Sequence, residues 1–413
     1  MSNRSKVVIV DPYSSGYGLA PAFRAKNVDA VAVRTAFEIP ESALDSWDPS
    51  HFVSILDGTM PEADLAAQVA EFEPLCILPG NESGVELAEA LTARVLPHIG
   101  NVPELAAARR DKWQTALALH RNGIPVLHQV GTAKPEAVEA WIAEFGLQGQ
   151  PLVLKPPKSA GTDNVHIVRA GQDWRPVFAQ ILGMINKMGL HNEQVLVQEL
   201  AEGIEYAVDT YTAGGVHGLV SVCRYRKRAI DDRLGIYEAV DFLPPGAPRV
   251  DALYDYVRAA LDAVGMRNGA AHVEVMDTPH GPRLIEVNAR LSGGHQQRLT
   301  RLATGDSQID RCVRHMVGEP LGGDGYNLNK HVTVAYLSAA RSGTWRNAEE
   351  MKALSQLRTF HDIHLVYGTG DHVPRTVDVF TSIGQVVLAS ESAAAVAEDY
   401  AAVRACEARM DIV

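Results

Sequence analysis

Residues 284–294 read Leu-Ile-Glu-Val-Asn-Ala-Arg-Leu-Ser-Gly-Gly, and this stretch decides the fold that we expect. Successive side chains of a β-strand point to opposite faces, so Glu286 and Asn288 would share one face while apolar residues occupy the other. A carboxylate and an amide on one face of an otherwise apolar strand indicate a polar site beside a core.

A second stretch upstream repeats the same alternation. Residues 272–276 read His-Val-Glu-Val-Met, and residues 277–283, which contain two prolines and a glycine, predict the loop of a hairpin. Paired antiparallel, the two strands would bring Glu274 beside Glu286 and Asn288. Three oxygen donors at one place suit a hard divalent cation, and Mg²⁺ typically takes few protein ligands and leaves the remainder to waters and nucleotide phosphates.

Composition places the chain among globular proteins of two or three domains. It has 413 residues, of which 46% are hydrophobic and 21% charged. The formal net charge of −12 argues against a nucleic-acid binder, which needs clustered Lys and Arg. It does not argue against local binding of a nucleotide.

Cysteine usage and hydropathy indicate a cytoplasmic protein that does not enter membranes. The four cysteines, at 76, 223, 312 and 406, lack the CxxC spacing of zinc sites and suggest no disulfide framework. The first residues run into a short strand without an apolar signal core, and no later apolar run is long enough to span a bilayer.

The N-terminal part predicts a parallel α/β sheet. Strands at 7–10 and 30–33 flank a helix at 19–26, and this alternation is typical of βαβ units. The loop after the first strand lacks GxGxxG, so a βα turn near a substrate pocket is favoured over dinucleotide binding. Further along, residues 81–83 (Asn-Glu-Ser) either line a cleft or cap the helix predicted at 85–94, and capping is the commoner explanation.

A helix is predicted over residues 103–122. Pro103 stands near its start, Ala and Leu fill its body, and Gly123 follows as a stop signal. Lys112 lies in this helix and on propensity alone would be a solvated lysine. The first domain boundary is expected just beyond, at 124.

A phosphate clamp is predicted next. The apolar strand 151–155 ends in Lys155, and the loop that follows carries Ser159, Gly161 and Thr162. Backbone N–H groups and hydroxyls of such a loop can wrap phosphate oxygens while the ammonium offsets their charge. The alternative is a flexible hairpin loop with a surface lysine.

An adenine-binding link is predicted between the strands 194–200 and 206–212. Backbone groups of such a link commonly bind adenine, and Glu205 could accept hydrogen bonds from ribose hydroxyls. Taken alone, Glu205 is more often a solvated turn carboxylate.

The rest of the chain adds a basic run, a core helix and a C-terminal unit. The run 224–228 (Arg-Tyr-Arg-Lys-Arg) lies either on an exposed strand or toward phosphates and an anionic substrate. The spacing of apolar residues in 251–264 predicts an amphipathic helix. The C-terminal unit is expected to consist of strands at 332–337, 363–366 and 385–389 and a helix at 393–406.

Four pieces in this order resemble the ATP-grasp superfamily of carboxylate–amine ligases over roughly residues 105–320. They are Asp111-Lys112, Leu154-Lys155-Pro156, residues 197–205, and Glu274 with residues 286–290. The opening at 11–16 and the ending at 289–295 look most like the L-amino acid ligases that make dipeptides, among them the bacilysin-type enzymes.

This resemblance implies an α/β (α+β) protein with the ATP-grasp fold. An N-terminal parallel α/β pre-ATP-grasp domain would cover residues 1–124 and a lid or central subdomain residues 125–210. The metal-binding and catalytic subdomain would cover 211–329, and a C-terminal mixed subdomain 330–413.

The resemblance also implies the site. It implies binding of ATP and of two Mg²⁺ ions, with Mn²⁺ as a substitute, and it implies amino acid substrates. Charge and hydropathy predict binding of neither nucleic acid nor membranes. We allow for a homodimer. The ATP phosphates would contact Lys112, Lys155 and the loop at Ser159, Gly161 and Thr162. Adenine and ribose would contact Gln198, Glu199, Leu200, Ala201 and Glu205, where Gln198 replaces an acid that relatives often carry. The metal ligands would be Glu274, Glu286 and Asn288, and the residues at the reacting groups Arg290, Gly294 and His295.

The chemistry that these residue types suit is amide formation through an acyl phosphate. Transition-state charge on phosphoryl oxygens calls for Mg²⁺, Lys and Arg rather than for many proton-transfer groups. Arg290 would stabilise this charge, and the 157–164 loop would close to exclude water. His295 either receives the amine proton or hydrogen-bonds the substrate.

Two rival functions remain from the sequence. One is another ATP-grasp reaction, carboxylation or phosphoryl transfer, and the other is a nucleotide-binding module without catalysis. The intact set of lysines, metal carboxylates and Arg290 argues against the second.

Overall fold

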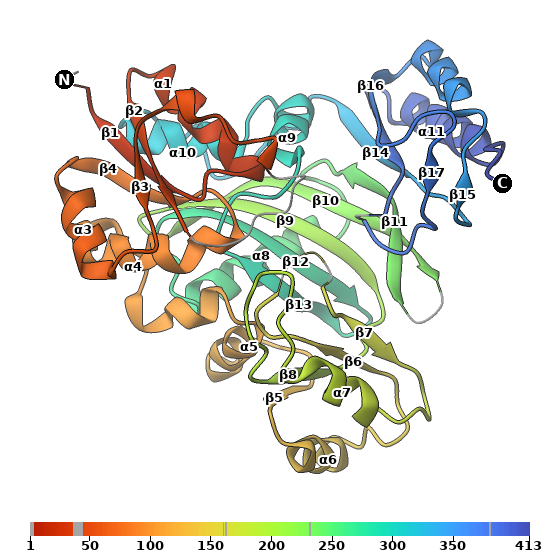
Figure 1. Cartoon of the computed structure of the whole chain (residues 1–413), viewed down its shortest axis with the longest axis horizontal. Coiled ribbons are helices and arrows are strands. Elements are labelled where there is room, and N and C mark those ends of the chain that lie inside the picture. Colours follow the sequence, from red (N-terminus) through yellow and green to blue (C-terminus); the bar gives the residue numbers. More distant parts are fainter. Residues whose placement is uncertain (1–3, 36–43, 160, 162, 231–232, 380) are drawn as a thin grey trace.

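The computed structural model describes residues 4–35, 44–159, 161, 163–230, 233–379 and 381–413. Figure 1 shows an N-terminal domain, a lid at the bottom of the view and a C-terminal unit, all joined to a long central sheet. Among the described residues, none of the helices combines the length and the apolar character needed to cross a bilayer.

The N-terminal domain has the parallel sheet that the sequence predicts. Its strand order is β3-β2-β1-β4, and β1 lies in the interior of the sheet. The apolar residues of β1 are buried on both faces because helices cover them, as is usual for parallel sheets. The elements are β1 (Lys6–Val10), η1 (Ser14–Gly18), α1 (Leu19–Arg24), β2 (Asp29–Arg34), η2 (Pro49–His51), β3 (Phe52–Asp57), α3 (Glu62–Ala70), β4 (Pro74–Pro79), η3 (Glu82–Gly84), α4 (Val85–Val95) and η4 (Pro97–Ile99).

The single helix predicted over 103–122 is wrong. The chain forms a 3-10 helix, η5 (Pro103–Arg109), and then the α-helix α5 (Lys112–Arg121). Asp111 between them is extended, and its carboxylate accepts hydrogen bonds from the N–H groups of Trp113 and Gln114. Asp111 is therefore the N-cap of α5. Because an N-cap residue has an extended backbone, no continuous helix can run from η5 into α5.

The lid is a small antiparallel sheet with two helices. Its strand order is β5-β8-β6-β7. Trp141 and Phe178 are buried in a core against the strands. The elements are β5 (Gln129–Thr132), α6 (Pro135–Glu144), β6 (Leu152–Lys155), β7 (His166–Val168), α7 (Arg175–Ile181) and β8 (Val195–Glu199).

The central sheet has the order β13-β12-β9-β10-β11-β14-β18-β16. β14 pairs with β11, so strands on both sides of the predicted boundary at 329/330 share one sheet, and the predicted boundary at 210/211 lies within β9. The elements are β9 (Ile204–Ala213), β10 (Val216–Ile230), β11 (Arg233–Phe242), α8 (Val250–Ala263), β12 (Gly269–Thr278), β13 (Gly281–Asn288), α9 (Gln296–Thr304), α10 (Gln308–Met316), β14 (His331–Leu337), β16 (Phe360–Leu365) and β18 (Gly384–Ser390).

The C-terminal unit contains the strands and the helix that the sequence predicts. Helix α11 (Ala393–Glu407) covers β14 and β18, and Trp345 is completely buried in the core beneath it. The additional elements are β15 (Gly343–Thr344), η6 (Ala348–Gln356) and β17 (His372–Val373).

The hairpin of β12 and β13 is tighter than the predicted loop 277–283. Thr278 pairs with Gly281, so only two residues connect the strands. Gly281 has φ +93°, a conformation that glycine adopts readily and that closes a short turn. The register nevertheless places Glu274 directly opposite Glu286, as predicted.

One face of the central sheet forms a core with α8, and the opposite face carries polar side chains on β9, β12 and β13 beside apolar ones that pack against α9 and α10. Val208, Val273 and Val287 lie in the core with the apolar side of α8. Because side chains alternate along each strand, the residues between these valines point to the opposite face. The sequence alternation thus builds the polar face that carries the site.

Arg109 ties the domains together from a buried position. Its guanidinium donates to the Glu89 carboxylate of α4 and to the carbonyls of Val102 and Val264, with distances between 2.5 and 3.0 Å. Only 1% of the Arg109 side chain is exposed. All of these contacts join η5 to the N-terminal domain and to the end of α8.

Replacing Arg109 by Ala should lower the free energy of unfolding by ~3–5 kcal/mol, because the Glu89 carboxylate, whose side chain is only 15% exposed, loses its cationic partner. Urea unfolding measures the loss. Arg94→Ala is the matched control, since Arg94 pairs with Glu62 on the surface and exposed pairs contribute only ~0–1 kcal/mol. Equal losses in the two variants would contradict this assignment.

Candidate functional site

The polar face of β9, β12 and β13 collects the predicted oxygen donors. Glu274 is paired with Glu286 in the ladder, and Asn288 lies two pairs further along, opposite His272. Glu205 of β9 lies opposite Met276 in the next ladder. The alternation therefore brings three carboxylates and one amide onto one surface.

Lys112 reaches this surface from the first turn of α5. Its Nζ lies 2.8 Å from Glu286 Oε1 and donates to the carbonyl of Ser159 at 3.0 Å. The break at Asp111 starts the helix at Lys112. The alternative of a solvated helix lysine is wrong, because only 9% of this side chain is exposed.

Lys155 lies at the end of β6 and faces the same region. Its Nζ is 3.3 Å from the side-chain oxygen of Gln198 on β8, and the residue is buried. Burial and the nearby Lys112 charge lower the pKa of Lys155 to about 8, while Glu286, Glu274 and Glu205 act in the opposite direction. Lys155 is thus a buried amine that donates to Gln198, and the alternative of a surface lysine is wrong.

Glu205 pairs with Lys227 of β10. Lys227 Nζ lies 2.7 Å from both carboxylate oxygens and 4.4 Å from the ring centre of Tyr237. Burial raises the pKa of Glu205, although the Lys227 charge opposes this. In the basic run 224–228, Lys227 therefore faces the site, whereas Arg224 and Arg226 pair with Asp241.

Glu274 has a buried histidine beside it. His272 Nδ1 lies 2.7 Å from Asp209 Oδ1, and His272 Nε2 lies 3.7 Å from Glu274 Oε1. Burial alone would lower the pKa of His272, but Asp209 and Glu274 raise it to about 10. Burial would raise the pKa of Glu274, yet His272, Lys227 and Lys112 hold it well below its usual value.

Arg290 follows β13 and contacts the N-terminal domain. Its guanidinium forms an ion pair with Glu82 and donates to Asn288 Oδ1 at 3.3 Å. Glu82 also pairs with Arg110 at 3.2 Å. Burial would raise the pKa of Glu82, but Arg290 and Arg110 lower it, so a carboxylate lies between two guanidinium groups.

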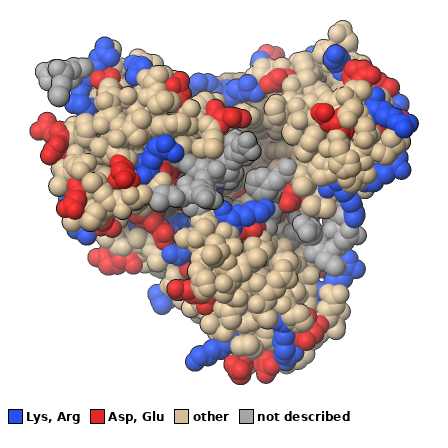
Figure 2. Space-filling view, in the orientation of Figure 1, with Lys and Arg blue, Asp and Glu red and all other residues tan. Residues whose placement is uncertain are grey.

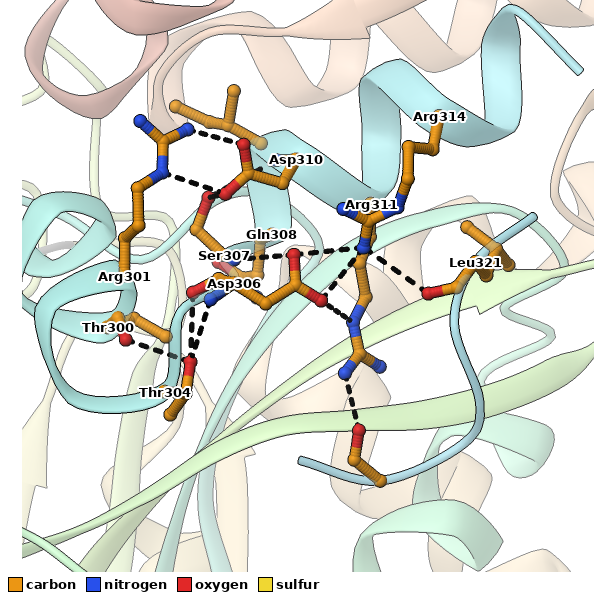
Figure 3. Close-up of polar contacts among 12 residues, drawn as sticks. Thr300, Arg301, Thr304, Asp306, Ser307, Gln308, Asp310, Arg311, Arg314 and Leu321 are labelled. Atoms are coloured by element: carbon orange, nitrogen blue, oxygen red, sulfur yellow. Dashed lines mark hydrogen bonds and ion pairs between the residues drawn. The ribbon is translucent and has the colours of Figure 1, made fainter. Parts of the chain in front are cut away.

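The loop after Arg290 is held by buried polar groups of α9 and α10. Gln308 Oε1 accepts from the Ser292 N–H at 2.9 Å and from Gln297 Nε2 at 2.7 Å. Figure 3 shows that Arg311 and Arg314 both point to Asp306, at the corner that sets the position of Gln308. This corner gives the Arg290 loop a fixed support.

Other predicted residues lie at the margin of the cluster. His295 is exposed at the start of α9, and burial of part of its ring and the Arg298 charge lower its pKa. Glu199 Oε1 accepts from the N–H of His128, so it is engaged with the chain before β5. The Gly294 N–H lies 3.3 Å from Ser14 Oγ of the N-terminal domain. 

Leu200 and Ala201 lie in the link between β8 and β9, and Gly161 adopts φ +62° in the loop after β6. Thr162 lies outside the described residues.

Two of the spaces that adjoin this cluster are lined by the predicted site residues or their partners. Between Lys112, Gln198 and Glu286 there is only about 10 Å³, because the paired side chains fill the gap. A cleft of about 650 Å³ is lined by Glu82, Arg110 and the segment 185–190. Figure 2 shows Lys and Arg atoms around a hollow where the three lobes meet.

Several residues of the cluster were missed from the sequence. Residues 81–83 are not among them: Asn81 caps η3 through the Glu82 N–H, and Glu82 and Ser83 line the cleft, as the other alternative predicts. Arg110 and Asp209 carried no signal because their partners lie far away in the chain. His272 could have been found, since it precedes Glu274 by two residues and must share its face.

The donor set fits a hard cation that a nucleotide completes. Among the described residues, no three His, Cys, Asp or Glu side chains form a metal-binding group. Two carboxylates and the Asn288 amide are instead the oxygen ligands that Mg²⁺ takes when phosphates and waters fill its remaining positions. Lys112 beside Glu286 supplies the positive charge in the present structure.

The comparisons agree with this geometry. The ATP-grasp domain family matches residues 148–298. The matched segment spans β6 to β13 and the start of α9, and it contains Glu274, Glu286, Lys155 and Arg290.

Relatives extend the likeness over the whole chain. Dapdiamide A synthase of Enterobacter agglomerans is 27% identical over 420 residues, which cover 99% of this chain and 97% of that protein. Mouse carnosine synthase 1 is 28% identical over 284 residues, 60% of this chain and 33% of that protein.

Solved structures show the same fold. The L-amino acid ligase from Bacillus licheniformis has a TM-score of 0.72 at 15% identity and covers 100% of this chain and 99% of its own. An N5-carboxyaminoimidazole ribonucleotide synthetase from Thermotoga maritima has a TM-score of 0.67 at 15% identity, with 99% of each chain covered. The predicted ATP-grasp fold with an N-terminal parallel sheet is confirmed.

Nucleotide affinity should depend on the protonation of Lys155. The ammonium attracts phosphate, so affinity should be highest below the Lys155 pKa of about 8 and fall as the pH rises through it. At pH 9 the loss should be up to about tenfold, because most of the free protein would carry a neutral amine. Calorimetric titration with ADP at pH 7 to 9 measures this.

Lys155→Arg is the control, because arginine stays charged over this range. If Lys155→Arg binds ADP and its ADP affinity still falls with pH as in the wild type, a group other than Lys155 is responsible for the pH dependence.

Proposed function

We propose that this protein is an ATP-dependent ligase that activates the carboxylate of one amino acid as an acyl phosphate and joins it to the amine of a second. The observation that carries the proposal is the convergence of Lys112, Lys155, Glu274, Glu286 and Arg290 on one polar face beside a cleft. Charges of this kind suit a phosphoryl transfer that needs positioning and electrostatic stabilisation. The names of dapdiamide A synthase and of the L-amino acid ligase support amide formation over carboxylation.

The nucleotide would lie between the lid and the polar face. Lys112 and Lys155 would contact its phosphates, and the loop with Ser159, Gly161 and Thr162 would cover them. The link Glu199–Ala201, with Gln198 before it, would contact adenine, and Glu205 the ribose. Since Lys112 now pairs with Glu286, binding would move the lysine from the carboxylate to a phosphate.

Glu274, Glu286 and Asn288 would hold Mg²⁺, and the number of ions that we propose is two, with Mn²⁺ as a substitute. The cation would supply charge neutralisation for the phosphates. If Mg²⁺ took the place of the Lys112 ammonium, the negative charge of Glu286 would stay balanced. The Lys112–Glu286 ion pair, in which Glu286 already takes a cationic partner, supports this assignment.

The reaction would take place beside Arg290. A carboxylate oxygen of the first substrate attacks the γ-phosphorus, and ADP leaves. The amine of the second substrate then attacks the acyl carbon, loses a proton, and phosphate leaves with the original carboxylate oxygen. Arg290, next to Asn288, would stabilise the charge that develops on the phosphoryl group and on the tetrahedral carbon.

The cleft at Glu82 and Arg110 is the candidate place for the substrates. Glu82 lines this cleft and also pairs with Arg290, so the cleft borders Arg290. The Glu82 carboxylate and the Arg110 guanidinium would offer both charges to a zwitterionic ligand. His295 and Gly294 remain predicted neighbours of the amine. Closure of the lid would exclude water, which would otherwise hydrolyse the acyl phosphate.

The cellular setting is also part of the proposal. A cytoplasmic location is supported by the four cysteines, which are all buried free thiols, as a reducing compartment favours. A homodimer stays a prediction, which sedimentation of the purified protein tests.

Replacing Glu286 by Ala should abolish ADP release with any pair of amino acids that the wild type joins, because a metal ligand and the partner of Lys112 are both lost. Mass detection of products with a coupled ADP assay measures this. Glu319→Ala, which removes an exposed carboxylate paired with Lys26, should behave as wild type. Retained amide synthesis by Glu286→Ala would refute the metal assignment.

Replacing Arg290 by Ala should lower kcat by ~10²–10³, as loss of one charge-stabilising donor does, while ADP affinity stays close to that of the wild type. Steady-state kinetics and ADP titration together separate the two effects. If the variant instead lost nucleotide affinity and kept kcat, Arg290 would act on binding and its proposed role would be wrong.

A further inference from the structure

His272 has no part in the reaction proposed above, yet it lies between the strands that carry the metal ligands. On β12 it is opposite Asp209 of β9 on one side and opposite Asn288 of β13 on the other. It precedes Glu274 by two residues and so shares its face. Only 8% of His272 is exposed.

Both ring nitrogens of His272 have defined neighbours. Nδ1 lies 2.7 Å from Asp209 Oδ1, a short contact to a carboxylate that is 1% exposed. Nε2 lies 3.7 Å from Glu274 Oε1 and 3.5 Å from Tyr225 Oη. Asp209 is itself 3.3 Å from Ser221 Oγ. The ring is thus held at one nitrogen and turned toward Glu274 at the other.

We propose that His272 is a positioning residue for the divalent cation: Asp209 fixes the ring, and the ring fixes the Glu274 carboxylate in the orientation that binds the metal. The inference rests on the proposed function, because the cation is the one that the reaction requires. Groups that orient metal ligands from outside commonly change metal affinity when they are replaced. Asp209 would then act on the metal through two intervening side chains.

A second buried histidine of the same sheet provides a comparison. His217 of β10 contacts Thr212 at 2.8 Å and Asp262 at 3.4 Å, and it is 5% exposed. None of these contacts is with a predicted metal or nucleotide ligand. His217→Gln therefore reproduces the chemical change and the burial of His272→Gln at a place without a metal role.

The test is titration of Mn²⁺ into the ADP-saturated full-length protein, followed by electron paramagnetic resonance of the free ion. In His272→Gln the affinity for Mn²⁺ should fall about 10- to 100-fold, the usual cost of losing such a partner. The Mn²⁺ affinity of Asp209→Asn should also fall, and that of His217→Gln should equal the affinity of the wild type. ADP affinity measured in the presence of EDTA should be unchanged in all three variants.

Unchanged Mn²⁺ affinity in a folded His272→Gln would overturn the inference. An equal fall in metal-free ADP affinity would also overturn it, because that result marks a general structural role. If His272→Gln does not fold, Asp209→Asn, which keeps the shape of the aspartate, decides alone by the same two measurements.

The readout is independent of amide synthesis. A wild type that binds Mn²⁺ with ADP but forms no amide would defeat the proposed function and leave the positioning role standing. A wild type that binds no Mn²⁺ in the presence of ADP would defeat the positioning role.

Discussion

The ion pair between Lys112 and Glu286 is the interaction on which the site depends. Both side chains are largely buried, and buried charges are costly unless each has a partner. Lys227 with Glu205 and Arg290 with Glu82 follow the same rule. The protein therefore balances its own charges. Under the proposed function, a nucleotide and its cation would exchange partners with these charges in matched pairs, which would link phosphate binding by the lysines to metal binding by the carboxylates.

A second consequence concerns the N-terminal domain. Glu82 joins Arg290 to Arg110, so a side chain from η3 takes part in placing Arg290. Arg109, one residue earlier, ties the same segment to α4 and α8. The two adjacent arginines thus connect the N-terminal domain with the central sheet and α8. In the proposed function this connection would favour a fixed distance between the substrate cleft and the phosphates.

Patterns within single strands predicted much of this structure. The alternation in 272–276 and 284–288 gave the polar face and the pairing of Glu274 with Glu286. The break between η5 and α5 at Asp111 was missed because the residues on both sides of Asp111 favour a helix, which hides the capping role of the aspartate. Arg110 and Asp209 were missed because their partners are distant in sequence, and the pairing of β11 with β14 is likewise a tertiary contact that no local pattern encodes.

The central claim is that a carboxylate is activated by transfer of phosphate to its oxygen. The most direct measurement uses an amino acid whose carboxylate carries ¹⁸O, incubated with ATP, Mg²⁺ and a second amino acid. Mass spectrometry of the products then follows the label. The account predicts one ¹⁸O atom in the released phosphate for each amide formed. Amide formation with unlabelled phosphate would contradict it, since the carboxylate oxygen would then have left by another route.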